Sequence, residues 1–259
     1  MQPELIKIGS YVIPGFTAAV AAAALLALAV SLALARKEGI DRMEMLSYAI
    51  FLRRSFWLGS VLYRLFLTSL TRPDTIAANL FHLRTLIERS GTSVLGGILG
   101  AALFSWIYLK RVGLPFWGTL DIAFTAIPLA QGIGRIGCFL GGCCYGRTTD
   151  LPWGVTFPGH DSPVHPTQLY ESALNLLNFA LLFFVYKRRR FGGQVFALYF
   201  FNYALIRFFI EFWRGDTFRG FVFRSSSPWT SLSIPQLVSL IGLGVGITLY
   251  LRLKKKATA

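Results

Sequence analysis

Long apolar segments alternate with short polar stretches along the chain, and this pattern predicts its architecture. Each apolar segment is close to the ~20 residues that a helix needs to cross a hydrocarbon core of ~30 Å. The segments run over residues 11–35, 49–70, 93–109, 117–140, 168–186, 193–212 and 234–253. In the second segment, Arg53, Arg54 and Arg64 require that the part deep in the membrane starts after Arg54. We therefore predict an all-α polytopic membrane protein with about seven transmembrane helices.

The basic residues gather between the apolar segments, and their placement predicts the orientation in the membrane. The chain is 54% hydrophobic and 15% charged, with a formal net charge of +14. Basic runs follow the first, third, fifth and seventh segments: Arg36, Lys37 and Arg42; Lys110 and Arg111; Lys187 to Arg190; Arg252 with Lys254 to Lys256. Because positively charged loops stay in the cytoplasm, we expect the N-terminus outside and the C-terminus inside. The same placement argues against nucleic-acid binding.

The remaining polar stretches are short, so we expect a single transmembrane domain over residues 1–259 with no large soluble part. Residues 146–166 are rich in glycine, proline and aromatic residues, which predicts a small outward-facing cap. Residues 71–91 predict a short interfacial helix with His82 on its surface. Asp121, near the inner end of the fourth segment, is either a functional group or a residue that caps a helix, and its position favours the second.

Residues 131–146 combine Arg135, three cysteines and six glycines at the outer end of the fourth segment. A guanidinium group about two turns below the membrane interface needs an anionic partner from the protein or from a ligand. The abundant anion of a bilayer is lipid phosphate, which arginine binds through paired hydrogen bonds. Arg135 is therefore a candidate phosphate ligand.

Four polar residues at the end of the sixth segment share one helix face. They are Tyr203, Arg207, Glu211 and Arg214, spaced by four, four and three residues. The two arginines outnumber the glutamate, and Arg135 raises the excess of positive charge to two. An anionic phospholipid head group is the expected counter-ion.

The segment from His165 to Glu171 leads into the fifth helix. Thr167 is the expected N-cap, and Glu171 lies in the first turn, where the helix dipole favours a carboxylate. A role in the site is the alternative interpretation of Glu171.

Cys138, Cys143 and Cys144 lie near the predicted oxidising face, and four interpretations remain open. Cys138 can form a disulfide with Cys143 or Cys144. Arg135, one turn away, can lower the pKa of Cys138 and make it a thiolate nucleophile. Three thiols without a matching histidine spacing are a weak zinc motif. The cysteines can also simply fill a glycine-rich turn, and no metal or other cofactor is expected.

With these residues, the chain resembles the bacterial prolipoprotein diacylglyceryl transferase family over nearly its whole length. Residues 134–146 (Gly-Arg-Ile-Gly…Gly) resemble the family signature, and residues 165–171 and 207–214 resemble two later motifs. Ser233-Ile-Pro-Gln236 also fits the start of the last helix. The resemblance implies an enzyme of the bacterial cytoplasmic membrane that moves diacylglycerol from phosphatidylglycerol to the lipobox cysteine in a prolipoprotein signal peptide. Glycerol phosphate is the other product.

The resemblance also implies the roles of individual residues. Arg135 and Arg207 would hold the donor phosphate and stabilise the departing glycerol phosphate, and Glu171 and Glu211 would orient those arginines or the acceptor. These four form the expected catalytic set. The expected substrate-binding residues are Arg214, Tyr203, Gly134, Gly137, His165, Gln168, Cys138, Gly96, Gly97 and Leu95.

The chain departs from the family pattern on the acceptor side. The family usually has a histidine, proposed to activate the acceptor thiol, where this chain has Leu95 in Ser93–Gly97. Phe16 replaces a tyrosine, Cys138 an asparagine and Cys143 an acidic residue. The small residues from Ser90 to Gly100 either pack helices together or line a site. The candidates for the missing base are His165, His82, Glu211 and a cysteine thiolate.

The resemblance, together with these departures from it, implies three possible functions. The first is transfer of diacylglycerol from phosphatidylglycerol to a prolipoprotein. The second keeps the phospholipid donor but uses another acceptor, such as a small molecule or a lipid. The third is a non-catalytic protein that binds or moves lipid. Leu95 is the residue that separates them.

Overall fold

The computed structural model describes residues 4–8, 11–71, 93–215, 220–223, 225 and 229–258 of the 259-residue chain. The chain divides into two compact units, one of residues 1–34 and 117–259 and the other of Ala35–Phe116. The predicted interfacial helix with His82 lies outside the described residues.

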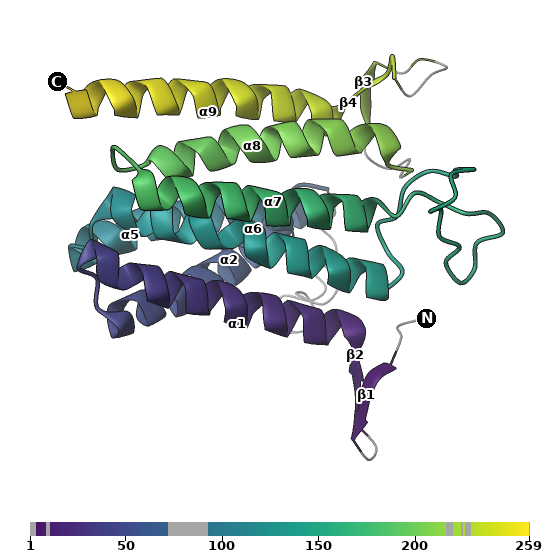
Figure 1. The fold of residues 1–259 in the computed structure, drawn as a ribbon, viewed down its shortest axis with the longest axis horizontal. Helices are drawn as coiled ribbons and strands as arrows, with labels where there is room; N and C mark the ends of the chain where they lie inside the picture. Colours follow the sequence, from purple (N-terminus) through teal and green to yellow (C-terminus); the bar gives the residue numbers. More distant parts are fainter. Residues whose placement is uncertain are drawn as a thin grey trace. The chain divides into compact units, whose positions relative to one another are not determined.

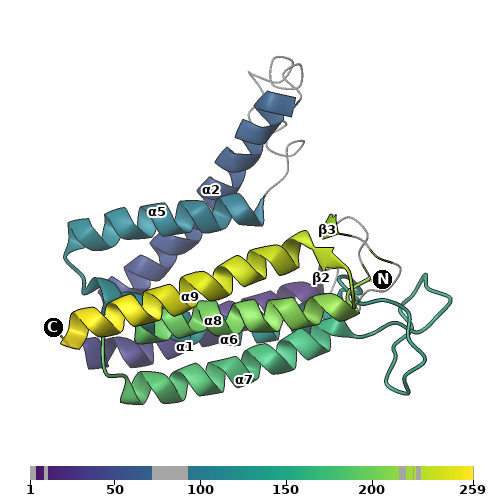
Figure 2. The same ribbon diagram turned by 90° about the horizontal axis from the view of Figure 1, so that it is seen from above.

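The first unit is a bundle of long helices. They are α1 (Gly15–Ala35), α6 (Phe116–Leu140), α7 (Thr167–Arg188), α8 (Gln194–Ile210) and α9 (Ile234–Thr258). Two short antiparallel pairs accompany them: β1 (Glu4–Ile8) with β2 (Tyr11–Pro14), and β3 (Phe221–Phe223) with β4 (Leu232–Ser233). Both pairs and the loop between α6 and α7 lie at one end of this bundle, and the C-terminus lies at the other (Figures 1 and 2).

Glycines allow the helices of this unit to approach each other closely. A Cβ atom on Gly132 of α6 would lie 2.8 Å from Leu176 of α7. One on Gly246 of α9 would lie 2.8 Å from the backbone nitrogen of Phe201 of α8. Small residues at such positions are a common device for packing transmembrane helices.

The second unit contains the short helix η1 (Arg36–Glu38), α2 (Arg42–Thr71) and α5 (Val94–Val112). A Cβ atom on Gly59 of α2 would lie 2.5 Å from the carbonyl oxygen of Gly96 and 2.7 Å from Cα of Gly100. On Gly97 it would meet the ring of Phe56 at 2.6 Å. The glycines of α5 therefore serve to pack α5 against α2, which is the first of the two predicted alternatives.

Six helices in the described part of the chain are long and apolar enough to span a membrane, namely α1, α5, α6, α7, α8 with its continuation to Trp213, and α9. The second predicted segment, 49–70, is helical but is not among the six, since Arg53, Arg54 and Arg64 interrupt its apolar character. The chain is a mostly helical multi-pass membrane protein. The count of seven spans and the orientation stay predictions.

The structure also corrects the ends of three predicted segments. The first helix begins at Gly15, because Tyr11–Pro14 forms strand β2 instead. The regular α-helix of the sixth segment ends at Ile210 and tightens into η2 (Glu211–Trp213). The last helix continues to Thr258, through the basic tail.

The structure confirms the prediction that Asp121 caps a helix, and the helix is α8. Its side chain is fully buried, and its carboxylate accepts hydrogen bonds from the backbone N–H groups of Gly193 (2.9 Å) and Phe196 (3.0 Å) at the start of α8. Arg189 pairs with the same carboxylate at 3.4 Å. A carboxylate at a helix N-terminus satisfies N–H groups that have no partner inside the helix.

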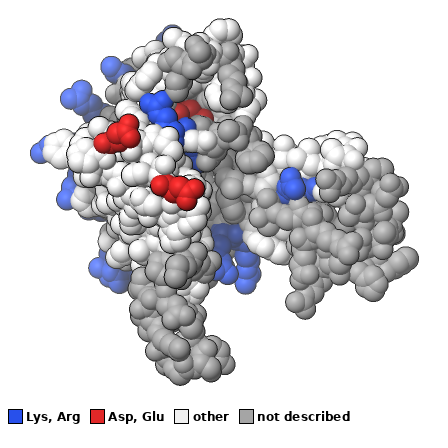
Figure 3. All heavy atoms as spheres, turned by 90° about the vertical axis from the view of Figure 1, so that its right-hand side faces the viewer, with Lys and Arg blue, Asp and Glu red and all other residues white. Residues whose placement is uncertain are grey.

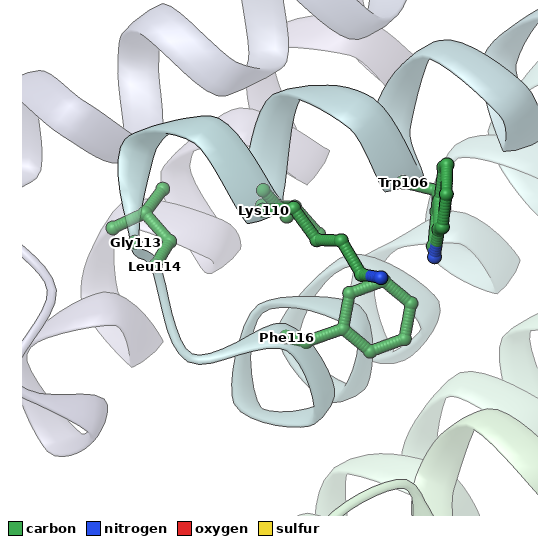
Figure 4. Close-up of a pocket in the computed structure, with 6 residues that line it drawn as sticks. Trp106, Lys110, Gly113, Leu114 and Phe116 are labelled. Atoms are coloured by element: carbon green, nitrogen blue, oxygen red, sulfur yellow. The ribbon is translucent and has the colours of Figure 1, made fainter.

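A cavity of about 370 Å³ lies in the second unit, where α5 ends and turns toward residue 116 (Figure 4). Its lining is mainly apolar, and the ammonium group of Lys110 lies 4.3 Å from the ring centroid of Trp106. The cavity contains none of the predicted site residues.

Candidate active site

The predicted charged residues converge in the first unit. Arg135 comes from the last turns of α6, Glu171 from the start of α7, Arg207 from the end of α8, Glu211 from η2, and Arg214 directly follows η2. We call these five residues the charge cluster. The glutamate side chains are 4% and 2% exposed, whereas those of Arg135 and Arg207 are 25% and 21% exposed. The arginines therefore form the accessible side of the cluster.

Glu171 lies at the centre of the charge cluster. One of its oxygens accepts from Nε of Arg135, and the other accepts from Arg207 at 2.8 Å. Arg214 approaches the second oxygen at 3.7 Å. A carboxylate at the start of a helix is thus an acceptor shared by three arginines, which supports the site interpretation of Glu171.

Glu211 completes the arrangement from the other side. Arg207 donates to it at 3.0 Å, in the i,i+4 pairing that the sequence predicts. The hydroxyl group of Ser233 donates to its second oxygen at 3.0 Å. Arg207 therefore bridges two buried carboxylates through its two terminal nitrogens.

Ser233 is a site residue that the sequence reasoning missed. Its backbone N–H donates to the side chain of Gln236 at 2.9 Å, and its hydroxyl accepts from the backbone N–H of Gln236 at 3.3 Å. This is a capping box, in which a serine and a glutamine three residues later satisfy each other's backbone donors at a helix start. The Ser-x-x-Gln spacing before an apolar run was the available signal.

The predicted excess of two positive charges is too large, because the carboxylate of Glu171 also belongs to the cluster. The cluster holds three guanidinium groups and two carboxylates, which leaves one net positive charge. Arg214 does not continue the helical face of Arg207 and Glu211, because the chain is extended there. It reaches Glu171 from outside the helix.

The loop between α6 and α7 is tied to the charge cluster by backbone hydrogen bonds. Gly146 donates to the carbonyl of His165 at 2.8 Å, and Arg147 donates to that of Trp213 at 2.9 Å. His165 donates to the carbonyl of Arg147 at 2.9 Å. The segment around Gly146 thus lies between the start of α7 and the residue before Arg214.

Viewed from the end of the molecule that carries this loop, most of the described surface is uncharged (Figure 3).

Replacing Gly146 by alanine is expected to destabilise the protein, by about 1–3 kcal/mol as for other overpacked sites. An alanine Cβ would clash with the carbonyl oxygen of Trp213, and it would lie 2.7 Å from Cβ of His165. The matched control is Gly134→Ala, because nothing lies within 4 Å of a Cβ there and alanine favours a helix. Thermal unfolding in detergent checks the pair, and an equal loss in both variants would contradict this packing argument.

Thr167 and Gln168 anchor the turn that follows α6. The hydroxyl of Thr167 donates to the carbonyl of Cys144 at 3.1 Å, and Nε2 of Gln168 donates to that of Cys143 at 2.6 Å. The expected N-cap role of Thr167 is wrong, since Thr167 is the first helical residue and its hydroxyl is a donor. Oε1 of Gln168 is buried and has no partner among the described residues.

His165, in the last part of the predicted cap, is buried. Its Nδ1 lies 3.3 Å from the hydroxyl of Tyr170, which in turn accepts from the indole of Trp153 at 2.8 Å. Burial lowers the pKa of His165, and the nearby charge of Arg147 lowers it further. The neutral imidazole that a general base requires is therefore favoured at neutral pH.

The three cysteines come together at the end of α6, and all are free thiols in the structure. Their Sγ atoms lie within 4.8 Å of one another, and those of Cys143 and Cys144 are 3.3 Å apart. The pKa of Cys144 is lowered to about 5, mainly by a hydrogen bond from Cys138 and further by the charges of Arg135 and Arg214. The pKa of Cys143 is raised, mainly by burial.

Other predicted site residues lie elsewhere or have a packing contact. Leu95 lies on α5 in the second unit and is 53% exposed. Gly96 and Gly97 lie on the same helix and are buried. Tyr203 stacks on Tyr199 with ring centroids 5.6 Å apart. A Cβ on Gly137 would lie 3.0 Å from Ala19 of α1. A substrate-binding role for these residues stays a prediction.

Comparison with known proteins gives the family. The sequence model of the prolipoprotein diacylglyceryl transferases matches residues 3–252. The chain belongs to the prolipoprotein diacylglyceryl transferase family. The predicted resemblance is thereby confirmed.

Curated relatives in this family carry the name phosphatidylglycerol–prolipoprotein diacylglyceryl transferase. The chain is 38% identical to that of Finegoldia magna over 171 residues, which are 66% of this chain and 64% of the relative. It is 40% identical to that of Clostridium tetani over 62% of this chain and 64% of the relative. It is 34% identical to that of Methylobacillus flagellatus over 76% and 69%. The alignment thus spans slightly less than two thirds of the first two relatives.

Proposed function

We propose that this member of the prolipoprotein diacylglyceryl transferase family transfers diacylglycerol from phosphatidylglycerol to the cysteine thiol of a prolipoprotein signal peptide. The names of the relatives support the donor and the acceptor class. The charge cluster is the observation in this chain that carries the proposal. One net positive charge, on the accessible side of buried carboxylates, suits a single phosphodiester anion.

The reaction has a simple balance of bonds and charge. The acceptor sulfur attacks the glycerol carbon of the diacylglyceryl group, and the bond from that carbon to the phosphate ester oxygen breaks. The phosphodiester, with one negative charge, becomes a glycerol phosphate monoester, whose second ionisation adds another. The thiol proton leaves with a base. Guanidinium groups placed at the phosphate stabilise the charge that develops, which is often the largest catalytic term.

Arg135 and Arg207 are the proposed phosphate ligands. Arg135 is paired with Glu171 on the Nε side of its guanidinium, and a planar guanidinium held that way can still present its terminal nitrogens to phosphate. Arg207 is fixed by both glutamates. Glu171 and Glu211 act as positioning residues in this proposal, since each accepts from arginine rather than facing the accessible side.

Buried polar groups continue below the charge cluster on the same helix faces. Gln131 lies one turn from Arg135, and Asn175 lies one turn from Glu171. One oxygen of each side chain is buried without a partner among the described residues. Such groups suit the ester carbonyl region of a lipid through hydrogen bonds from bound water, or the acceptor backbone through its N–H groups. We propose that the site opens to the outer leaflet of a bacterial cytoplasmic membrane.

Complementation of a strain depleted of its own diacylglyceryl transferase tests the function. Rescue of growth, with diacylglyceryl-modified lipoprotein detected by mass spectrometry, is the expected result. No rescue combined with continued consumption of phosphatidylglycerol would favour another acceptor. If growth is not rescued and phosphatidylglycerol is not consumed, the proposal that the protein is an enzyme is overturned.

Leu95→His is the variant that separates the acceptor hypotheses. If the chain lacks only the family's acceptor-activating histidine, this variant should raise prolipoprotein transfer above that of the parent chain. If another group already serves as base, the rate should stay the same. Leu99→His, at an exposed position one turn further along α5, is the control for a general effect of histidine.

A further inference from the structure

The three cysteines at the end of α6 form a compact donor set, which we call the thiol cluster. Cys138 lies in the last turn of α6, and Cys143 and Cys144 lie in the turn that follows. The backbone N–H of Cys143 donates to the carbonyl of Cys138 at 3.1 Å, which closes the turn. Gly142 has φ = 65°, and Cys144 has φ = 66°. Among the described residues Cys144 is alone in having a positive φ without being glycine, so the turn adopts a costly backbone conformation there.

We propose that the thiol cluster binds one thiophilic metal ion, with Zn²⁺ as the representative ion. The sulfurs of a tetrahedral zinc site lie about 3.8 Å apart, given a Zn–S distance of about 2.3 Å. Here the Sγ atoms of Cys143 and Cys144 lie 3.3 Å apart, and all three Sγ atoms lie within 4.8 Å of one another. Small adjustments of side-chain torsion bring such a set to equal distances. Water or a further ligand takes the fourth position.

The alternatives explain less of the geometry. A disulfide uses two of the three sulfurs and leaves the convergence of the third without a reason. A vicinal bond between Cys143 and Cys144 is strained. Packing alone does not explain why all three sulfur atoms lie within 4.8 Å of one another. A metal uses all three sulfurs.

The charges around the thiol cluster suit a metal–thiolate complex. Zn²⁺ with three thiolates carries one formal negative charge, and the three thiols release up to three protons when it forms. Arg135 carries positive charge at the same end of α6. Arg135 also precedes Cys138 by three residues, which places both on one face of α6.

A bound metal would fix the corner between α6 and α7. The carbonyls of Cys143 and Cys144 accept from Gln168 and Thr167, in the first turn of α7. Glu171 follows in the next turn. The metal would therefore hold the end of the helix that carries Arg135 against the helix that carries its partner.

Cobalt binding tests the proposal on the full-length protein, purified in detergent without a histidine tag and kept reduced. We expect one Co²⁺ per chain, with the visible absorption of tetrahedral cobalt and a near-ultraviolet thiolate charge-transfer band. Zn²⁺ should displace it. Cys138→Ser, Cys143→Ser and Cys144→Ser should each lose the charge-transfer band or weaken binding by at least tenfold. His160→Ala, which removes a histidine of the cap, is the control and should bind normally.

Two outcomes would overturn the metal site. One is the absence of stoichiometric Co²⁺ or Zn²⁺ binding, or binding that persists in all three serine variants. The other is a single reactive thiol in the protein isolated without reductant and treated with chelator, since this count indicates a disulfide. Unfolding temperature adds an independent measurement. It should rise with Zn²⁺ concentration in the parent protein and in His160→Ala, and stay constant in the serine variants.

Discussion

Replacing Glu171 by glutamine is expected to lower kcat about 100-fold or more while leaving the KM for the phospholipid donor unchanged or lower. Glu171 accepts from Arg135 and Arg207, and Arg214 lies 3.7 Å away. A glutamine has one acceptor oxygen in place of two, and its amide group would face a guanidinium. The arginines lose the carboxylate that holds them in place together, but the net positive charge of the cluster increases. Attraction of the anionic donor therefore persists while the geometry needed for the transition state is lost.

Steady-state kinetics with phosphatidylglycerol vesicles and a lipobox peptide measure whether kcat falls while the donor KM does not rise. Glu44→Gln, an exposed position at the start of α2, is the matched control and should leave both parameters unchanged. The free energy of unfolding should also fall, because the arginines lose the buried carboxylate that they share. A large rise in the donor KM with kcat preserved would show instead that Glu171 contacts the substrate directly.

The fold was predictable where one physical effect dominates. Apolar length alone gives α5, α6 and α7 to within three residues, because a membrane helix must bury every backbone polar group internally. The errors lie at ends, where local backbone chemistry decides. Tyr11–Pro14 is apolar enough to continue α1 but pairs with β1. The helix tightens at Glu211, whose side chain accepts hydrogen bonds from Arg207 and Ser233.

The site was predictable in its charges but not in its partners. Spacing within one helix gave the Arg207–Glu211 pair. No local pattern could give the distance from Glu171 to Arg135 and Arg207, because it depends on how three helices pack. Ser233 was missed for a different reason. The Ser-x-x-Gln spacing indicates a capping box, but nothing in the sequence indicates that the Ser233 hydroxyl also contacts Glu211. The thiol cluster likewise depends on the turn at Gly142 and Cys144, which brings Cys138 close to the other two sulfurs.

The second large effect is expected for Arg207→Lys, which keeps the charge but should lower kcat by about 10²–10³-fold. Arg207 donates through separate nitrogens to Glu171 at 2.8 Å and Glu211 at 3.0 Å. A lysine ammonium is a single point donor and cannot span both carboxylates and a phosphate at once. Arg214→Lys should lower kcat by a smaller factor than Arg207→Lys, since Arg214 approaches Glu171 through one nitrogen at 3.7 Å and a lysine ammonium can also make a single contact. Arg252→Lys, in the exposed tail of α9, is the control.

The ratio of the two kinetic parameters decides what Arg207 does. The donor phosphate carries one negative charge before the carbon–oxygen bond breaks, and the leaving glycerol phosphate develops a second. A group that stabilises this developing charge acts more strongly on the transition state than on the bound donor, so kcat should fall by a larger factor than KM rises. If Arg207→Lys instead raises KM and leaves kcat intact, Arg207 contributes equally to both states. It would then bind the head group without assisting its departure, and Arg135 would have to carry the leaving-group role alone.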